Sequence, residues 1–82
     1  MMDLKFKIID EDYSVKVQKL LVSIGCTWSD FDRSIKHTSA PYLFVSGNTM
    51  SWTKSKEIFD EDTGIEFSLE DLERLWIVKY YN

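Results

Sequence analysis

The sequence predicts an α+β domain, a small antiparallel β-sheet with one main helix packed on it and a short C-terminal helix. Three observations predict this class. Apolar and polar residues alternate near the N-terminus, an apolar pattern with helical spacing follows directly, and a two-residue turn separates two alternating segments in mid-chain. A chain of 82 residues forms one domain, so we expect residues 1–82 to share a single core.

The first two predicted elements are a strand and the main helix. Leu4, Phe6 and Ile8 alternate with lysines, as in a half-buried strand. Acidic residues 10–12 suit a helix N-terminus, and we expect Asp12 or Ser14 to cap it. Residues at helical spacing are expected on the core side: Tyr13, Val17, Leu20, Leu21 and Ile24. Polar residues are expected on the opposite side: Lys16, Gln18, Lys19 and Ser23. Gly25 is expected to end the helix in the left-handed conformation.

Residues 26–41 show neither the strand nor the helix period. We therefore expect an irregular connection here. A connection of about 15 residues without regular structure is uncommon in a compact domain and is often functional.

A β-hairpin is predicted in the middle of the chain. Residues 42–46 and 49–53 flank Gly47-Asn48, which is typical of a type II′ turn. Such a turn pairs residue 46 with 49, 45 with 50, 44 with 51 and 43 with 52. Side chains expected in the core are Leu43, Val45, Met50 and Trp52. The other face holds Tyr42, Phe44, Ser51 and Thr53, and is either a self-association surface or a second core layer beneath the C-terminal segment.

The remaining elements are short. Residues 54–59 are expected to extend the hairpin or to begin another strand, residues 60–64 to form a solvated turn, and residues 65–67 a strand. Ser68 and Asp71 resemble a capping box at the start of a helix. The apolar stripe of that helix would be Leu69, Leu72, Leu75 and Trp76. Residues 77–82 fit a last strand, a helical end or a docking tail.

Charge and composition exclude several function classes. Residues 57–82 carry eight acidic and two basic side chains, whereas residues 1–56 carry six acidic and eight basic ones, for a net charge of −4. This acidic third argues against duplex DNA as a partner, because DNA binding needs a basic surface. No apolar run approaches the roughly 20 residues of a membrane span, and the charged start is unlike a signal peptide. The single cysteine, Cys26, excludes a disulfide within the chain and a cysteine-based zinc site, which fits a reducing compartment.

Candidate catalytic and metal-binding groups are few. A dyad of Cys26 with the only histidine, His37, is the one nucleophile–base pair available, and Cys26 is equally explained as a small buried residue. Asp60, Asp62 and Gly64 resemble the start of a calcium loop, but the glycine falls fifth instead of sixth and no Glu stands at the twelfth position. We therefore expect no catalytic residue, no bound metal and no cofactor.

Aromatic residues make up 15% of the chain, more than a small monomer is expected to bury. The surplus predicts a homo-oligomer interface, a partner surface or a ligand pocket. Rings can stack on bases and cations can hold phosphate. Trp28 also fits as a core plug beneath the helix. The residues predicted to bind a ligand are Trp28, Arg33, Lys36, Tyr42 and Phe44.

Three stretches carry a resemblance to a known group. They are the helix end Gln-x-Leu-Leu-x-x-x-Gly-x-x-Trp (residues 18–28), the strand Tyr-Leu-x-Val (42–45) and the helix Leu-Glu-Asp-Leu (69–72). The chain resembles small tailed-phage accessory proteins in these stretches. It departs from them at residues 65–68, Ile-Glu-Phe-Ser, where a Glu-Ile-Thr form is more usual. The resemblance implies an accessory protein acting in the host cytoplasm, possessing no catalytic activity and directed against bacterial immunity.

Three functions follow as hypotheses. The first is a non-enzymatic protein that sequesters a nucleotide immune signal, of the cyclic-nucleotide or ADP-ribose type, as a homo-oligomer. The second is an inhibitor that binds a host defence protein through the acidic C-terminal face: Glu57, Asp60, Glu61, Asp62, Glu66, Glu70 and Glu73. The third is a virion-assembly adaptor.

Overall fold

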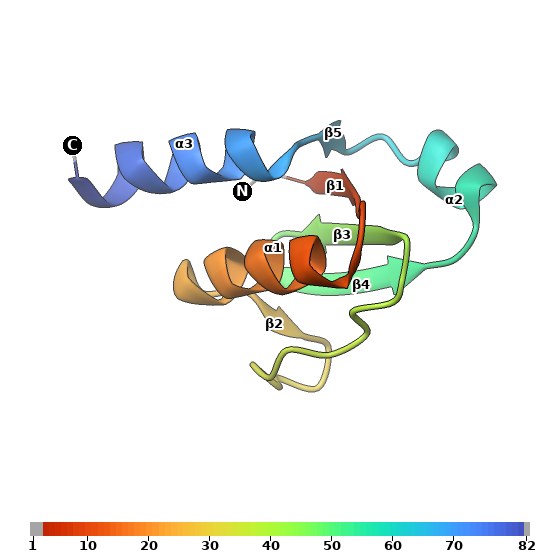
Figure 1. The fold of residues 1–82 in the computed structure, drawn as a ribbon, viewed down its shortest axis with the longest axis horizontal. Coiled ribbons are helices and arrows are strands. Elements are labelled where there is room, and N and C mark those ends of the chain that lie inside the picture. The colour runs from red at the N-terminus through yellow and green to blue at the C-terminus, as the bar shows by residue number, and fades with distance from the viewer. Residues whose placement is uncertain (1–2, 82) are drawn as a thin grey trace.

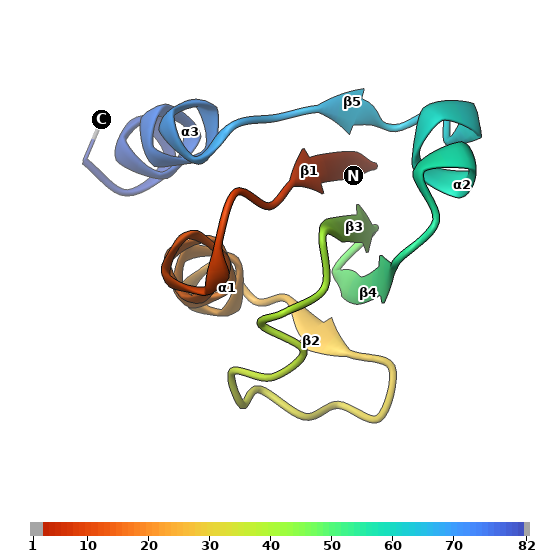
Figure 2. The same ribbon diagram turned by 45° about the vertical axis from the view of Figure 1, so that its right-hand side comes forward.

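The computed structural model describes the backbone of residues 3–81 and the side chains of residues 3–77. It is an α+β fold built on a five-stranded sheet in the order β2-β4-β3-β1-β5. The elements follow the chain as β1 (Leu4–Lys7), α1 (Glu11–Ser23), β2 (Thr27–Trp28), β3 (Tyr42–Ser46), β4 (Thr49–Thr53), α2 (Lys56–Glu61), β5 (Ile65–Glu66) and α3 (Leu69–Tyr81). Helices α1 and α3 lie on one side of the sheet and α2 on the other (Figures 1 and 2).

The sheet is mixed and not wholly antiparallel. Strands β1, β3 and β4 pair antiparallel as predicted, but the two outer strands β5 and β2 pair parallel with β1 and β4. The directions of β2 and β5 follow from the helical connections that precede them. The connection through α1 makes β2 run in the same direction as β1, and the connection through α2 makes β5 run in the same direction as β4. Since β1 and β4 are themselves parallel, β5 is parallel to its neighbour β1 and β2 to its neighbour β4.

Helix α1 begins two to four residues earlier than its expected caps would place it. Its N-cap is Asp10, whose Oδ1 accepts a hydrogen bond from the Tyr13 amide at 2.8 Å. The caps proposed from sequence are both inside the helix, where Asp12 is exposed and Ser14 is fully buried. The C-terminal prediction is confirmed, because Gly25 has a φ of +101°. The amides of Gly25 and Cys26 donate to the carbonyls of Val22 and Leu21, which forms a Schellman motif.

The main core lies between the sheet and helices α1 and α3. It consists of apolar side chains from every layer: Leu4, Phe6, Val17, Leu21, Cys26, Trp28, Leu43, Val45, Met50 and Leu72. Gln18 of α1, which was expected to face solvent, is also buried and has no exposed surface.

The hairpin has the predicted register. Val45 lies opposite Met50 and Leu43 opposite Trp52, and Gly47 adopts a φ of +65° in the turn. Leu43, Val45 and Met50 are buried as expected. Trp52 differs, with 39% of its surface exposed, because β2 pairs with β4 only as far as Met50.

The second face of the hairpin is a small second core layer, and α2 covers it in place of the C-terminal segment. The prediction that residues 54–59 extend the sheet is wrong, since Ser55 caps the helix over residues 56–61. Phe59 of α2 is buried and stacks on Tyr42 at 4.7 Å between ring centroids, with Phe44 at 6.0 Å. Lys5 joins this layer, and its ammonium donates to the carbonyls of Phe59 and Asp62 at 2.7 and 3.0 Å. A cation there is favourable, because these carbonyls form the C-terminal end of α2.

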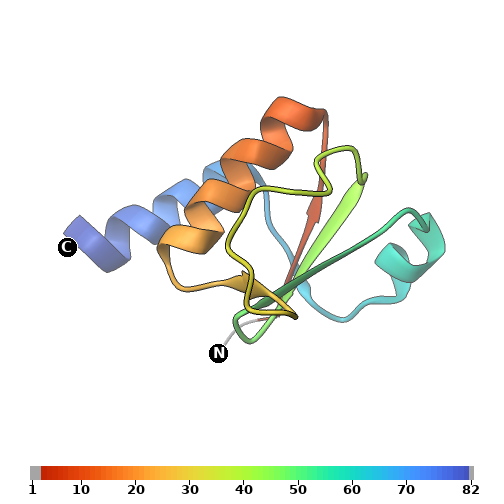
Figure 3. The same cartoon turned by 90° about the horizontal axis from the view of Figure 1, so that it is seen from below.

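The C-terminal part of the chain follows the predicted order. The turn predicted at residues 60–64 is shorter than expected, because Asp60 and Glu61 belong to α2. Gly64 donates its amide to Asp62 Oδ1, which makes residues 62–64 a turn, and β5 follows. The capping box is confirmed by reciprocal bonds between Ser68 and Asp71. Helix α3 is as long as α1, so residues 77–81 are helical and form neither a strand nor a tail, while Asn82 lies outside the described residues. Figure 3 shows α3 running beside α1, where the Trp76 indole donates to Ser23 Oγ. Within residues 3–81, no helix has the length and apolar character needed to span a bilayer.

Candidate functional site

The connection between β2 and β3 begins with a tight turn that places an aromatic ring in solvent. The Phe31 amide donates to the Trp28 carbonyl and the Trp28 amide donates to the Asp32 carbonyl, both at 2.9 Å. Residues 29–31 therefore form a three-residue turn that ends in a left-handed residue. That residue is Phe31, with a φ of +65° and 86% of its surface exposed.

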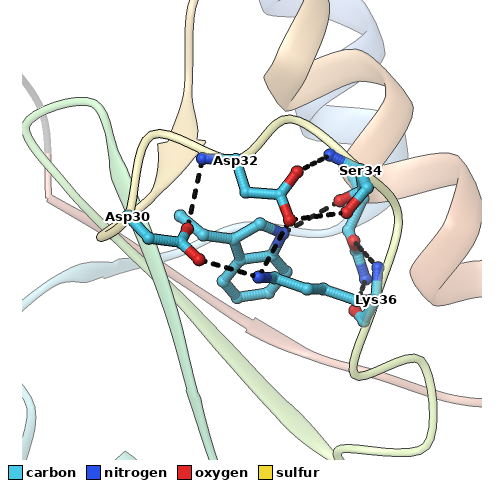
Figure 4. Close-up of polar contacts among 6 residues, drawn as sticks. Asp30, Asp32, Ser34 and Lys36 are labelled. Carbon is cyan, nitrogen blue, oxygen red and sulfur yellow. Dashed lines mark hydrogen bonds and ion pairs between the residues drawn. The ribbon is translucent and has the colours of Figure 1, made fainter.

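Carboxylates inside the turn hold its shape (Figure 4). Asp32 accepts hydrogen bonds from the Ser34 amide at 2.8 Å, the Ser34 hydroxyl at 2.9 Å and the Lys36 ammonium at 3.1 Å. These bonds, led by the one from the Ser34 amide, lower the pKa of Asp32 to about 2. Asp30 accepts from the Asp32 amide, which lowers its pKa, and lies 3.4 Å from the Lys36 ammonium. Lys36 thus serves two carboxylates, and the hydrogen bond to Asp32 raises its pKa.

Gln18 fastens the far end of the same loop to helix α1. Its Nε2 donates to the Lys36 carbonyl at 2.8 Å and to Ser14 Oγ at 3.0 Å, while its Oε1 accepts from the Lys36 amide at 3.0 Å. The sequence analysis assigned Gln18 to the solvent side. Its spacing of four residues from Ser14 and three from Leu21 was the available signal that it shares their buried row.

Two tryptophans and the single histidine form an aromatic cluster beside this loop. His37, which also has a positive φ of +56°, stacks on Trp52 and meets Trp28 edge-on, with centroids 5.1 Å apart in both pairs. Trp28 is 95% buried, and its indole N–H donates to the Ser34 carbonyl. A cavity of about 380 Å³ is lined by side chains that include Trp28, Asp30, Lys36, His37 and Trp52.

The five residues predicted to bind a ligand lie in two separate places. Trp28 and Lys36 come together, with the ammonium 5.7 Å from the indole centroid, and Arg33 is exposed on the same loop. Tyr42 and Phe44 lie on the opposite face of the sheet under Phe59. One chain therefore does not bring all five into one pocket. The cavity also contains Trp52, which the sequence analysis placed in the core, and His37, which it considered as a catalytic partner of Cys26.

A second hollow lies on the face that α2 covers. Its volume is about 390 Å³, and its lining includes Phe44, Trp52 and Ile58 together with the carboxylates of Asp3 and Asp62. Ile58 is 55% exposed at its border. This hollow combines apolar surface with negative charge.

The acidic edge comprises Glu57, Asp60, Glu61, Asp62, Glu66, Glu70 and Glu73. All seven are exposed. Six lie on α2, β5 and α3 and Asp62 directly follows α2, and these elements run along one side of the molecule (Figure 1). Asp60 pairs with Lys56 at 2.7 Å and Glu66 lies 4.0 Å from Lys7. The other five form no ion pair with a residue that the structure describes. Most of this edge is therefore uncompensated negative charge.

The side chains considered for catalysis or metal binding take part in core packing, ring contacts or local ion pairs and hydrogen bonds. Cys26 is buried in the core, whereas His37 is exposed and held between two indoles. Asp60 pairs with Lys56 on α2, and Asp62 bonds to Gly64. In the described part of the chain, no three His, Cys, Asp or Glu side chains are grouped as a metal ion would require.

Comparison of the chain with protein-family models, with curated proteins and with solved structures finds no match. Fold and geometry are therefore the basis for any functional proposal.

Proposed function

We propose that the protein is a non-enzymatic inhibitor that binds a bacterial defence protein through its acidic edge. The observation that carries this proposal is the set of seven exposed carboxylates on α2, β5 and α3 and at the end of α2, most of them without an ion-pair partner among the described residues. The resemblance to tailed-phage accessory proteins supports a phage origin and a site of action in the host cytoplasm.

The expected partner surface is a basic groove, as in an enzyme that binds nucleic acid or another anionic substrate. Carboxylates on the rim of an interface accelerate association with a basic partner and make it sensitive to salt. When the acidic edge is bound in such a groove, its carboxylates would pair with the basic side chains of the partner and so exclude the anionic substrate. This action needs no chemical step by the inhibitor.

A capture experiment with two charge variants tests the proposal. The full chain is immobilised and exposed to bacterial lysate at low salt, and a retained protein is purified and bound again. Glu61→Lys with Glu73→Lys changes the edge by four charges without touching a helix cap or an ion pair within the described residues. The control changes net charge equally at exposed positions off the edge: Ile9→Lys, Asp12→Asn, Ser39→Lys and Asn48→Lys. We expect the edge variant to lose the partner and the control to keep it. Equal loss in both, or no specific partner for the wild type, would refute the proposal.

A second candidate function is sequestration of a nucleotide signal, of the cyclic-nucleotide or ADP-ribose type. The cavity bounded by Trp28, Lys36, His37 and Trp52 favours it, because about 380 Å³ lies within the usual size range of ligand pockets. The exposed face of Trp52 would stack the base. Phosphate would have to compete with Asp30 and Asp32 for Lys36, or use Arg33 or a second protomer of a homo-oligomer.

Tryptophan fluorescence against a panel of nucleotide signals tests this second candidate. Binding should quench the signal of the wild type and be lost in Trp52→Ala. Tyr42→Ala should bind normally if the cavity within one chain is the site. Native mass spectrometry of the same protein reports whether it is an oligomer and whether it carries a nucleotide. Absence of quenching with every ligand would eliminate this candidate.

A further inference from the structure

The hollow of about 390 Å³ on the α2 face has an apolar wall that packing within the chain leaves partly uncovered. Trp52, near the end of β4, is 39% exposed and Ile58 of α2 is 55% exposed, and both border the hollow beside the buried ring of Phe44. Figure 2 shows this side of the molecule, where the chain leaves β4 and enters α2. Large exposed apolar side chains around one hollow are typical of a surface that a ligand or partner covers.

Two carboxylates from opposite ends of the sequence also line this hollow. Asp3 precedes β1 and Asp62 follows α2, and the chain after Asp62 returns to Asp3 because the Ile65 amide donates to the Asp3 carbonyl at 2.9 Å. Asp3 Oδ1 accepts the Gly47 amide at 3.3 Å. Asp62 Oδ1 accepts the Gly64 amide at 2.7 Å. These amides orient the carboxylates and leave their charges in place.

The lysines of the surrounding segments do not neutralise the hollow. Lys5 lies beneath α2, where its ammonium donates to the carbonyls of Phe59 and Asp62. Lys56 pairs with Asp60 on the surface of α2. Neither Asp3 nor Asp62 forms an ion pair with a residue that the structure describes. The segments that contain the lining residues, 3–5, 44–46 and 51–66, together hold six acidic and three basic side chains.

Charge and shape together therefore call for a ligand that is apolar along its length and cationic at its end. No lysine, arginine or histidine is among the described residues that line the hollow, so the cation has to come from outside it. Trp52 presents an aromatic wall, and the opposite border is the aliphatic Ile58. A guanidinium group stacks on an indole more readily than an ammonium does, and its planar set of donors can serve two carboxylates.

We propose that the hollow receives an arginine side chain of the basic partner that binds the acidic edge. The aliphatic stem of the arginine would cover Ile58, while its guanidinium stacks on Trp52 and pairs with Asp3 and Asp62. Asp62 belongs to the acidic edge and to the hollow, so one basic surface can engage both. Arginine is also among the residues that contribute most to binding at protein interfaces. This inference rests on the proposed function and names the side chain that the partner contributes.

An NMR titration of the full chain with N-acetylarginine N-methylamide tests the hollow without the partner. We expect millimolar affinity, as for a small ligand, with shifts at the backbone amides of Ser51, Thr53 and Thr63 and at the indole N–H of Trp52. N-acetylcitrulline N-methylamide has nearly the same shape but no charge. It should bind at least about tenfold more weakly, because it forms no charge-assisted bond with the carboxylates.

Three variants separate the hollow from the acidic edge. Asp3→Asn removes one charge of the hollow, keeps an oxygen for the Gly47 amide and leaves the edge unchanged. Asp12→Asn is the matched control, at an exposed carboxylate of α1 that pairs only with Lys16 among the described residues. Asp3→Asn should bind the arginine probe and the purified partner at least about fivefold more weakly than Asp12→Asn does. Ile58→Ala, at an exposed position of the wall, should weaken both in the same direction, and amide spectra report the fold of each variant.

Several results would overturn the inference: equal binding of the arginine and citrulline probes, shifts confined to the acidic edge, or an affinity for the partner that Asp3→Asn leaves unchanged. Hollow signals that move when the protein alone is diluted would assign the hollow to a second copy of the chain, which also contradicts it. The proposed function fails separately. Binding of the arginine probe in the hollow, without an edge-dependent partner, supports the arginine pocket and refutes only the acidic-edge proposal. An edge-dependent partner that binds Asp3→Asn normally refutes only the pocket.

Discussion

At the scale of single residues, buried polar groups decide the course of the irregular loop. Gln18 is the clearest case, since its amide satisfies both backbone groups of Lys36 while it has no exposed surface of its own. A polar residue on an amphipathic helix is by default assigned to solvent. Only the presence of the loop across from it makes burial favourable, and no pattern within α1 encodes that presence.

Removing this amide should destabilise the whole domain. We expect Gln18→Ala to lower the free energy of unfolding by about 2–4 kcal/mol, because two partly buried backbone groups lose their partners and a cavity remains at the buried side chain. Lys19→Ala, at the next, exposed position, should change it by less than about 0.5 kcal/mol. Urea unfolding measures both, and hydrogen exchange at the Lys36 amide reports the local effect. A loss below about 0.5 kcal/mol for Gln18→Ala would contradict the clamp.

Asp32 gives the turn a defined dependence on pH. Its pKa in the folded protein is about 2, against an ordinary value of 3.8, because it accepts bonds from Ser34 and Lys36. The carboxylate therefore contributes stability at pH values above about 4 that is lost as the pH falls toward 2. The variant Asp32→Asn should be less stable than the wild type at pH 6, and the difference should shrink between pH 4 and 2. Urea unfolding across that range, with NMR titration of the carboxyl group, checks this. A difference that is constant with pH would contradict it.

At the scale of elements, those specified by local pattern were predicted and those specified by tertiary contact were not. The register of β3 and β4 was correct because a two-residue turn and strict alternation fix it within twelve residues. The capping box of α3 is likewise a local signal. Helix α2 was missed because its six residues contain one buried side chain, Phe59, which gives no periodicity. Strands β2 and β5 have two residues each, too few for alternation to indicate direction.

Lys5 should hold α2 on the sheet. Its ammonium meets two carbonyls at the end of α2 and lies 4.5 Å from the Phe59 centroid. We expect Lys5→Met to lower the free energy of unfolding by about 1–3 kcal/mol, because these carbonyls lose a charged donor. Lys7→Met is the matched control on the same face, and its exposed side chain should contribute less than about 0.5 kcal/mol. Hydrogen exchange should be faster in α2 of the Lys5 variant alone. Unchanged exchange there would show that Phe59 suffices.

At the scale of the whole molecule, the aromatic surplus inferred from composition is mostly absorbed. Among the Phe, Trp and Tyr rings whose side chains are described, only Phe31 and Trp52 are exposed, because α2 adds a second core layer that the sequence pattern did not reveal. The second core layer also explains why the five predicted ligand residues lie on two faces of the sheet, since Tyr42 and Phe44 pack against α2 and Trp28 and Lys36 lie on the other face. The concentration of acidic residues in the C-terminal third was predicted correctly as an exposed acidic surface, because charged side chains stay in solvent whatever the detailed packing of the core. Oligomerisation stays a prediction that solution mass can test.

The affinity of the purified partner as a function of ionic strength tests the acidic edge most directly. Raising the salt concentration from 50 to 300 mM shortens the screening length well below the span of the edge, so the wild type should bind at least about tenfold more weakly. The Glu61→Lys, Glu73→Lys variant should bind weakly at both concentrations, and the charge-matched control should follow the wild type. A wild-type affinity that is independent of salt, or an edge variant that binds as tightly as the control, would contradict the account.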